Sequence, residues 1–179
     1  MARVLPSCRN SHGAPCERSP RVVPNPQMEA LIFVGVQGSG KTSFYRDRFF
    51  DSHVRISLDL LRTRQREQLL LGACLQGKQS FVVDNTNPLP SDRSRYIGLA
   101  RASGFRVVAY FFETTLQDAI RRNNQRAGKH RIPVPGVAGT FRKLLSPKLE
   151  EGFDEIYTVR ISPENGFVVE RESSPPAER

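Results

Sequence analysis

The chain has 179 residues, of which 38% are hydrophobic and 25% are charged, a balance typical of one folded domain. Lysine and arginine outnumber aspartate and glutamate by 27 to 18, and the net charge of +9 favours polyanionic partners. The apolar runs are too short for a membrane-spanning helix, so no membrane association is expected. The three cysteines form no CxxC pair, which gives no support to a disulfide framework or a zinc site and indicates a reducing, intracellular compartment.

Both ends of the chain differ in composition from its middle. Residues 1–27 contain five prolines, four arginines and one acidic residue, without a helical period or an apolar core segment. This composition predicts a disordered or dispensable arm rather than a secretory signal. Residues 171–179 (RESSPPAER) are predicted to be a disordered tail. The folded domain is therefore predicted to cover residues 28–170.

Apolar runs alternate with helical patterns within the predicted domain. The continuous apolar run at residues 30–36 is typical of a strand buried on both faces. Alternating strands and helices predict an α/β fold, with a parallel β-sheet sandwiched by α-helices. The predicted strands cover residues 30–36, 53–57, 81–84, 105–112 and 155–160, and the predicted helices cover residues 42–50, 60–76, 91–104, 114–128 and 137–145.

A glycine-rich segment follows the first predicted strand and precedes the first helix. Residues 35–42 (GVQGSGKT) match the phosphate-binding pattern GxxxxGK[ST] at every fixed position, in the context that this motif requires. Its glycines let backbone N–H groups point at phosphate oxygens beside a helix N-terminus. Lys41 is expected to reach the β- and γ-phosphates, and the Thr42 hydroxyl to bind Mg²⁺. The predicted ATP-binding residues are Gly35, Gln37, Gly38, Ser39, Gly40, Lys41, Thr42 and Ser43.

Asp84 ends the apolar strand FVVD at residues 81–84. A carboxylate at the carboxyl end of a strand beside a phosphate-binding loop can hold Mg²⁺ directly or through water. An aspartate that only ends the strand or caps a helix is the alternative interpretation. Together with the loop, Asp84 predicts ATP and Mg²⁺ as cofactors.

A phosphate-binding loop alone does not distinguish a kinase from a GTPase or a motor ATPase. The NKxD signature of GTPases is absent from the chain. A kinase also needs a base for the acceptor hydroxyl, an acceptor pocket and a cationic lid. Asp59 follows the second predicted strand and is the candidate base, and Arg62, one helical turn away, could hold an anionic acceptor. A helix-capping aspartate beside a solvated arginine would show the same spacing.

The strongest charge feature is the segment 119–149, which contains no acidic residue. Arg122 and Arg126 are spaced i, i+4 on one predicted helix face, and their planar guanidinium groups suit bidentate phosphate contacts. A merely solvated basic face would usually alternate its charges. We therefore expect a basic helical lid in which Arg122 and Arg126 are catalytic. The basic residues of this segment are Arg121, Arg122, Arg126, Lys129, Arg131, Arg142, Lys143 and Lys148.

These motifs together resemble the 5′-kinase domain of the polynucleotide kinase family, including the kinase half of polynucleotide kinase–phosphatases. The similar stretches run from about residue 31 to residue 156 and include GVQGSGKTSFY, SLDLLR, VVDNTNPLPSDRSRY, RRNNQR and FRKLLSPKLEEGFDEI. DNTNP followed by R-x-R-Y is the most specific of them. The resemblance implies a P-loop kinase fold in which Asp59 is the general base, Arg62 contacts the acceptor's phosphate, and Arg122 and Arg126 act on the ATP phosphates. No DxDxT phosphatase motif is present.

The leading hypothesis is ATP- and Mg²⁺-dependent transfer of the γ-phosphate to the 5′-hydroxyl end of DNA or RNA, in nucleic-acid end repair. Arg62, Asp84, Thr86 and Arg93 are predicted to bind this substrate, and Arg64 and Arg95 are further candidates for backbone phosphates. A P-loop kinase with a small-molecule hydroxyl acceptor and a non-catalytic ATP-binding module are the alternatives. The sequence leaves DNA against RNA and the oligomeric state open.

Overall fold

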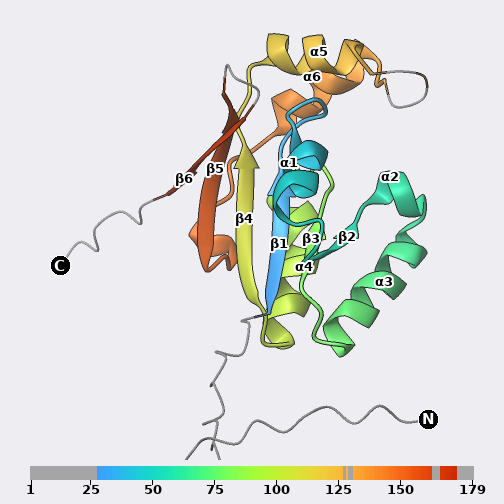
Figure 1. Cartoon of the computed structure of the whole chain (residues 1–179), viewed down its shortest axis with the longest axis vertical. Helices are drawn as coiled ribbons and strands as arrows, with labels where there is room; N and C mark the ends of the chain where they lie inside the picture. Colours follow the sequence, from blue (N-terminus) through green and yellow to red (C-terminus); the bar gives the residue numbers. More distant parts are fainter. Residues whose placement is uncertain (1–27, 127, 129–130, 163–165, 173–179) are drawn as a thin grey trace, which may run out of the picture.

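The computed structural model describes residues 28–126, 128, 131–162 and 166–172. Its centre is a six-stranded sheet in the order β2-β3-β1-β4-β5-β6 (Figure 1). The strands β1 to β5 pair in parallel, and β6 runs antiparallel to β5. The predicted α/β class with a parallel sheet is therefore confirmed. The strands are β1 (Glu29–Val34), β2 (Val54–Ile56), β3 (Phe81–Val83), β4 (Arg106–Phe112), β5 (Glu155–Ile161) and β6 (Phe167–Arg171).

Helices cover both faces of the sheet and the edge formed by the carboxyl ends of its strands (Figure 1). Helix α1 packs on one face, α3 and α4 pack on the other, and α5 and α6 lie together above the carboxyl ends. Within the described ranges, no helix has both the length and the apolar character needed to cross a membrane. The helices are α1 (Lys41–Arg48), α2 (Leu58–Leu61), α3 (Arg64–Gln76), α4 (Pro90–Ala102), α5 (Leu116–Asn124), α6 (Val134–Lys143) and the short 3₁₀ helix η2 (Leu149–Glu151).

Strand β1 lies in the middle of the sheet and is buried on both faces. Ile32 belongs to the cluster formed with α3 and α4, whereas its neighbour Phe33 packs against Phe44 of α1. Successive side chains of a strand point to opposite faces, so one uninterrupted apolar run supplies both halves of the core. Phe33 and Phe112 have ring centroids 5.0 Å apart. This packing gives the loop after β1 a rigid base.

The predicted helix at residues 60–76 is divided into α2 and α3. Arg62 has a left-handed backbone (φ 66°), which ends α2 after one turn. Thr63 then caps α3, because its side-chain oxygen accepts a hydrogen bond from the Arg66 N–H. A left-handed backbone at a residue other than glycine costs about 1–3 kcal/mol and is common at functional sites. The interruption lies beside Asp59, so it shapes the segment that carries the candidate base.

The strand β6 is absent from the predicted elements. It pairs with β5 from Ile161 opposite Phe167 to Tyr157 opposite Arg171. The signal that could have found it is the sequence Asn165–Gly166 before an apolar run, which is typical of a hairpin. Arg171, assigned above to the tail, ends this strand and forms an ion pair with Glu155 at 2.7 Å. The predictions for residues 1–27 and 173–179 lie outside the described residues.

Arg93 is a structural residue of α4, which corrects the prediction that it binds substrate. Its side chain is 0% exposed. It donates hydrogen bonds to the carbonyl oxygens of Leu89, Pro88 and Leu145, and it pairs with Glu151 at 3.0 Å. A guanidinium group enclosed in this way is not accessible to a substrate phosphate. It joins α4 to the segment around η2 instead.

Replacing Arg93 by leucine is expected to destabilise the protein by about 3–5 kcal/mol, because it removes the buried cation that pairs with Glu151 and leaves the Leu145 carbonyl oxygen without its donor. Urea unfolding should show a lower midpoint with an unchanged slope. Arg95→Ala is the matched control, because this arginine is exposed and its pair with Asp92 is long, at 3.8 Å. An equal loss in both variants would contradict the structural role of Arg93.

Candidate active site

The phosphate-binding loop joins β1 to α1 at the centre of the sheet. Neighbours of β1 are β3 on one side and β4 on the other, so the loop lies where the strand order reverses and ligands bind in open α/β sheets. Gly38 and Gly40 have φ angles of +78° and +98°, which favour glycine. A Cβ at Gly38 would also collide with the backbone oxygen of Ala119. Because Gly38 has no side chain, the phosphate-binding loop lies closer to the backbone of the lid helix α5 than any other residue at this position would allow.

Lys41 lies inside this loop at the start of α1. Its Nζ donates hydrogen bonds to the carbonyl oxygens of Gly35 at 2.9 Å and Val36 at 2.7 Å. Burial lowers the pKa of Lys41 to about 8, although Asp84 and Asp59 act in the opposite direction. The Lys41 ammonium group thus donates to carbonyl oxygens of the loop. In a nucleotide complex, phosphate oxygens could take the place of these carbonyl oxygens as acceptors.

The two predicted metal ligands lie in contact. The Thr42 hydroxyl donates a hydrogen bond to Asp84 Oδ2 at 2.8 Å, and the Asp84 side chain is almost fully buried. Arg55 of β2 pairs with the same Asp84 oxygen at 2.6 Å and stacks over the Tyr45 ring. A carboxylate beside a hydroxyl is an oxygen donor set that suits Mg²⁺. Arg55 already compensates the charge of Asp84, so a Mg²⁺ ion bound here would share or replace that contact.

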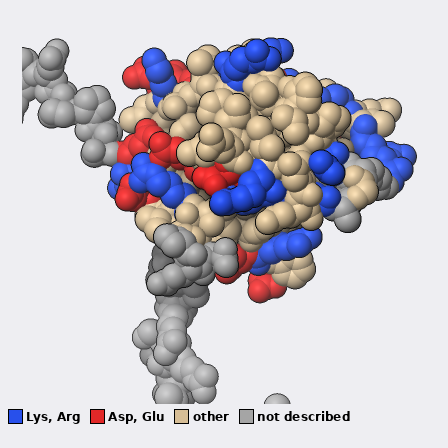
Figure 2. Space-filling view, turned by 90° about the horizontal axis from the view of Figure 1, so that it is seen from above, with Lys and Arg blue, Asp and Glu red and all other residues tan. Residues whose placement is uncertain are grey.

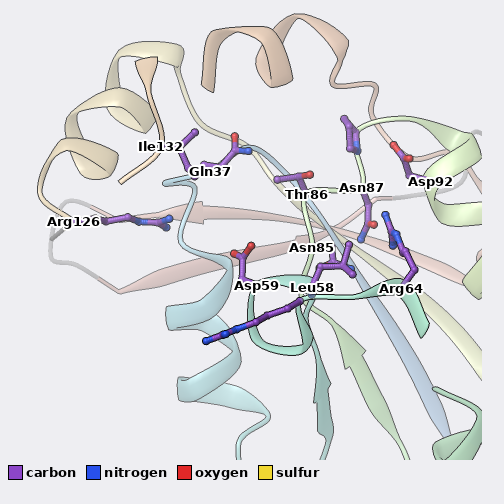
Figure 3. A pocket seen from close by; sticks show the side chains of 12 residues that line it. Gln37, Leu58, Asp59, Arg64, Asn85, Thr86, Asn87, Asp92, Arg126 and Ile132 are labelled. Atoms are coloured by element: carbon purple, nitrogen blue, oxygen red, sulfur yellow. The ribbon is translucent and has the colours of Figure 1, made fainter. Parts of the chain in front are cut away.

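A cavity of about 740 Å³ opens beside the loop. Asp59 points into it from α2, and Arg126 points into it from the segment just after α5 (Figure 3). Gln37 of the phosphate-binding loop and Thr86 from the segment after β3 line the same space. The structure therefore brings together side chains that lie far apart in the sequence. The lining residues are Gln37, Leu58, Asp59, Arg62, Arg64, Asn85, Thr86, Asn87, Pro88, Asp92, Arg126 and Ile132.

The DNTNP segment after β3 connects the loop, the cavity and α2. The Thr86 carbonyl accepts a hydrogen bond from the Gly35 N–H at 3.0 Å. Asn87 is buried and its Nδ2 donates to the Phe33 carbonyl at 2.8 Å. Asn85 Oδ1 accepts from the Leu58 N–H at 2.9 Å. The sequence predictions omitted both asparagines, although the motif that contains them was available as the signal.

The two lid arginines have different surroundings. Arg122 Nε donates a hydrogen bond to the Gly38 carbonyl at 2.7 Å, and its Nη2 contacts the Thr114 hydroxyl. Arg126 is exposed and lines the cavity. Arg122 therefore attaches α5 to the phosphate-binding loop, whereas Arg126 is available to a ligand.

Asn123, another residue missed by the sequence predictions, organises the lid. It is fully buried, its Nδ2 donates to the Ile132 carbonyl at 2.7 Å, and its Oδ1 accepts from the Ile132 N–H at 3.1 Å. This reciprocal pair connects the end of α5 to the segment before α6. The pair of asparagines at positions 123 and 124, between Arg122 and Arg126, is the sequence feature that could have indicated this role.

The remaining predicted residues of the site are at its edge or outside it. Ser39 is buried in the loop, whereas Ser43 is exposed on α1. Arg121 is exposed, pairs with Asp118 at 2.7 Å and does not line the cavity. Lys129 lies outside the described residues. Seen from above, the molecule carries separate groups of lysine and arginine, while most of the acidic side chains in view lie on the left and a few lie at the lower edge (Figure 2). The exposed cations of the predicted lid are Arg121, Arg126, Arg131, Arg142, Lys143 and Lys148.

A family model described as "AAA domain" matches residues 31–146, from β1 through the lid. The chain belongs to this family of P-loop proteins. It is 32% identical over 138 residues to a protein of Acanthamoeba polyphaga mimivirus whose name describes a bifunctional polynucleotide phosphatase/kinase, a match that covers 73% of this chain and 33% of that protein. The resemblance to polynucleotide kinases is thus confirmed. The chain spans about a third of the length of the curated relatives it matches.

Solved structures show the same fold at lower identity. A chain of the Pnkp1/Rnl/Hen1 RNA repair complex is 19% identical, with a TM-score of 0.57, over 70% of this chain and 47% of its own length. A gluconokinase from Sinorhizobium meliloti 1021 is 18% identical, with a TM-score of 0.53, over 76% of this chain and 84% of its own length. The P-loop kinase fold is therefore shared by proteins whose names describe nucleic-acid repair and a small-molecule kinase.

Proposed function

We propose that this chain is an ATP-dependent kinase that phosphorylates the 5′-hydroxyl end of DNA or RNA in nucleic-acid end repair. One observation carries the proposal: Asp59, Arg62 and Arg126 line a single cavity beside the phosphate-binding loop. Around a bound nucleotide, a phosphoryl-transfer site needs a carboxylate that can take a proton, a cation that binds the acceptor and a lid cation that acts on the transferring phosphate. The named polynucleotide phosphatase/kinase relative supports a nucleic acid as the acceptor.

In the proposed reaction, the terminal 5′-oxygen of the acceptor forms a bond to the γ-phosphorus of ATP. The bond between that phosphorus and the bridging oxygen of ADP breaks, and the Asp59 carboxylate takes the hydroxyl proton. Lys41 and the loop N–H groups hold the ATP phosphates. Arg126 stabilises the charge that develops on the transferring group, because its guanidinium can donate to two phosphate oxygens.

Thr42 and Asp84 are the residues that would hold Mg²⁺. Thr42 is at the start of α1 and Asp84 directly follows β3, and their side-chain oxygens, which are the ligand type a hard cation prefers, lie in contact. Bound there, the ion would neutralise charge on the phosphate oxygens. Asp84 is nearly buried, so it belongs to this metal site more than to the substrate surface to which the sequence analysis also assigned it.

The test of this proposal is transfer of labelled γ-phosphate from ATP to a 5′-hydroxyl oligonucleotide. Wild-type protein should transfer the label to DNA or RNA, and Lys41→Ala should abolish transfer. The matched comparison is gluconate and other small hydroxyl acceptors, because a likeness to gluconokinase favours this second function. Transfer to an oligonucleotide should weaken steeply as salt is raised, whereas a small acceptor with a single charge or none should show little salt dependence. Transfer to small acceptors alone would overturn the nucleic-acid assignment.

ATP affinity is expected to fall as pH rises above about 8. The pKa of Lys41 in the free protein is about 8, and phosphates bind its protonated form. Each further pH unit should therefore weaken ATP binding by about tenfold, up to the pKa of Lys41 in the complex. Fluorescent-nucleotide titrations across this range measure the effect. Lys41→Met should bind weakly at every pH and show no such slope, and a wild-type affinity independent of pH would contradict the prediction.

A further inference from the structure

A buried carboxylate lies outside the residues that the proposed reaction uses. Glu67, in the first turn of α3, is only 1% exposed. Its two oxygens accept from three side chains: Tyr96 OH at 2.8 Å, Asn85 Nδ2 at 2.9 Å and Arg64 Nη1 at 2.7 Å. A buried carboxylate is costly unless it is paired and hydrogen-bonded. These contacts meet that requirement, and two of the three donors line the acceptor cavity.

The contacts with Glu67 fix the orientation of Asn85. Burial and the hydrogen bond to Glu67 raise the pKa of Tyr96 to about 12, so its phenol remains a donor at neutral pH. Because Asn85 Nδ2 also faces Glu67, the Asn85 Oδ1 is left to accept from the Leu58 N–H. The N-cap residue of α2, Ser57, provides no side-chain hydrogen bond of its own. Asn85 therefore provides the side-chain hydrogen bond that Ser57 does not provide at the start of α2, and it does so at Leu58, the residue directly before Asp59.

Arg64 is held at the cavity wall by the same carboxylate. Its Nη1 donates to Glu67 and, at 3.1 Å, to Tyr96 OH, while half of its side chain remains exposed. Among the contacts that the structure describes for Arg64, only Nη1 is engaged. The other guanidinium nitrogens are left for a ligand in the cavity, and guanidinium groups favour planar phosphate contacts.

We propose that Glu67 is a positioning residue for the acceptor. It holds Arg64 as a receptor for a phosphate of the acceptor strand, and through Asn85 it fixes the segment that carries Asp59. The proposal rests on the proposed function for the identity of the acceptor. The buried network around Glu67 connects Arg64, which would bind the acceptor strand, to the segment that carries the base Asp59. A strand bound by Arg64 would therefore present its hydroxyl to an Asp59 that is already in place.

The experiment compares Glu67→Gln, Arg64→Ala and the double variant. Glutamine keeps the size of Glu67 and removes the charge that holds Arg64. Both single variants should raise the oligonucleotide KM by about tenfold and lower the salt slope by about one. Glu67→Gln should also lower kcat several-fold, and each variant should bind ATP as the wild type does. The double variant should show the KM of Arg64→Ala, because both changes remove the same contact.

Arg46→Ala is the charge-matched control, because Arg46 is exposed on α1 and does not line the cavity. It should leave KM and kcat unchanged. Binding of a fluorescent 5′-hydroxyl oligonucleotide is measured for the same proteins. This measurement tests the role of Glu67 even if the wild type transfers no phosphate. Failure of the wild type to transfer phosphate would count against the proposed function alone. Unfolding scans identify variants that fail to fold.

Three outcomes would overturn the proposal. In the first, Glu67→Gln lowers the unfolding temperature but leaves KM, the salt slope and oligonucleotide binding of the folded protein unchanged. In the second, the effects of Glu67→Gln and Arg64→Ala on KM add fully in the double variant. In the third, which decides the matter if Glu67→Gln does not fold, Arg64→Ala binds and phosphorylates oligonucleotides as the wild type does.

Discussion

Asp59→Asn is expected to lower kcat for oligonucleotide phosphorylation by about 10²–10⁴-fold, the usual contribution of a positioned general base. Asparagine keeps the size of the side chain but cannot take the hydroxyl proton. Asp59 is exposed at the mouth of the cavity and supports no hydrogen bond of the fold among the described residues. The variant should therefore fold normally, and the loss should lie in chemistry.

Two measurements separate that loss from other effects. ATP binding by Asp59→Asn should stay close to wild type, because the nucleotide is held by the phosphate-binding loop and not by α2. Asp51→Asn is the matched control: Asp51 is an exposed aspartate in the turn after α1, outside the cavity lining. If Asp59→Asn kept kcat within a few-fold of the wild type, Asp59 would not be the base.

Arg126→Ala is expected to lower kcat by about 10³-fold, the lower end of the effect of an arginine that stabilises a transferring phosphoryl group. Arg126 lines the cavity, and its charge contributes to the lowered pKa of Lys41. The two cations therefore act on the same region of space. Because the charge on the transferring group grows as the reaction proceeds, the loss should appear in kcat more than in the KM for ATP.

Arg121→Ala is the matched control for the lid. Arg121 lies near the same end of α5, is exposed, pairs with Asp118 at 2.7 Å and is not among the residues that line the cavity. Single-turnover phosphorylation should show nearly wild-type rates for Arg121→Ala and the full loss for Arg126→Ala. Similar rates in the two variants would mean that the lid acts through its overall charge, and the specific role of Arg126 would be lost.

Local sequence was sufficient for the features that depend on a few consecutive residues. The phosphate-binding loop is one of them, because its conformation follows from the placing of glycines between a buried strand and a helix. Lys41 and Thr42 accordingly lie where this loop meets α1, and their contacts with ATP and Mg²⁺ stay predictions. The parallel sheet is another, since uninterrupted apolar strands that alternate with helices have few ways to bury both faces.

The environment of a side chain could not be predicted from local sequence in the same way. Arg93 and Arg64 were both assigned to phosphates, yet Arg93 is enclosed by carbonyl groups and Arg64 lies in the cavity wall. Side-chain type and spacing do not distinguish these two environments. The difference arises because the segment before η2 packs over α4 and not over α3.

The sequence by itself determined the class of fold, the nucleotide loop and the set of charged residues from which a site could be built. Only the tertiary structure decided which of these residues meet. Asp59 and Thr86 converge because the carboxyl ends of parallel strands share one edge of the sheet, where Arg126 joins them from the segment after α5. Glu67 meets Asn85 because α3 packs on the sheet beside β3. Apart from the i, i+3 pair of Arg64 and Glu67, these contacts join residues distant along the chain, so local pattern carries no record of them.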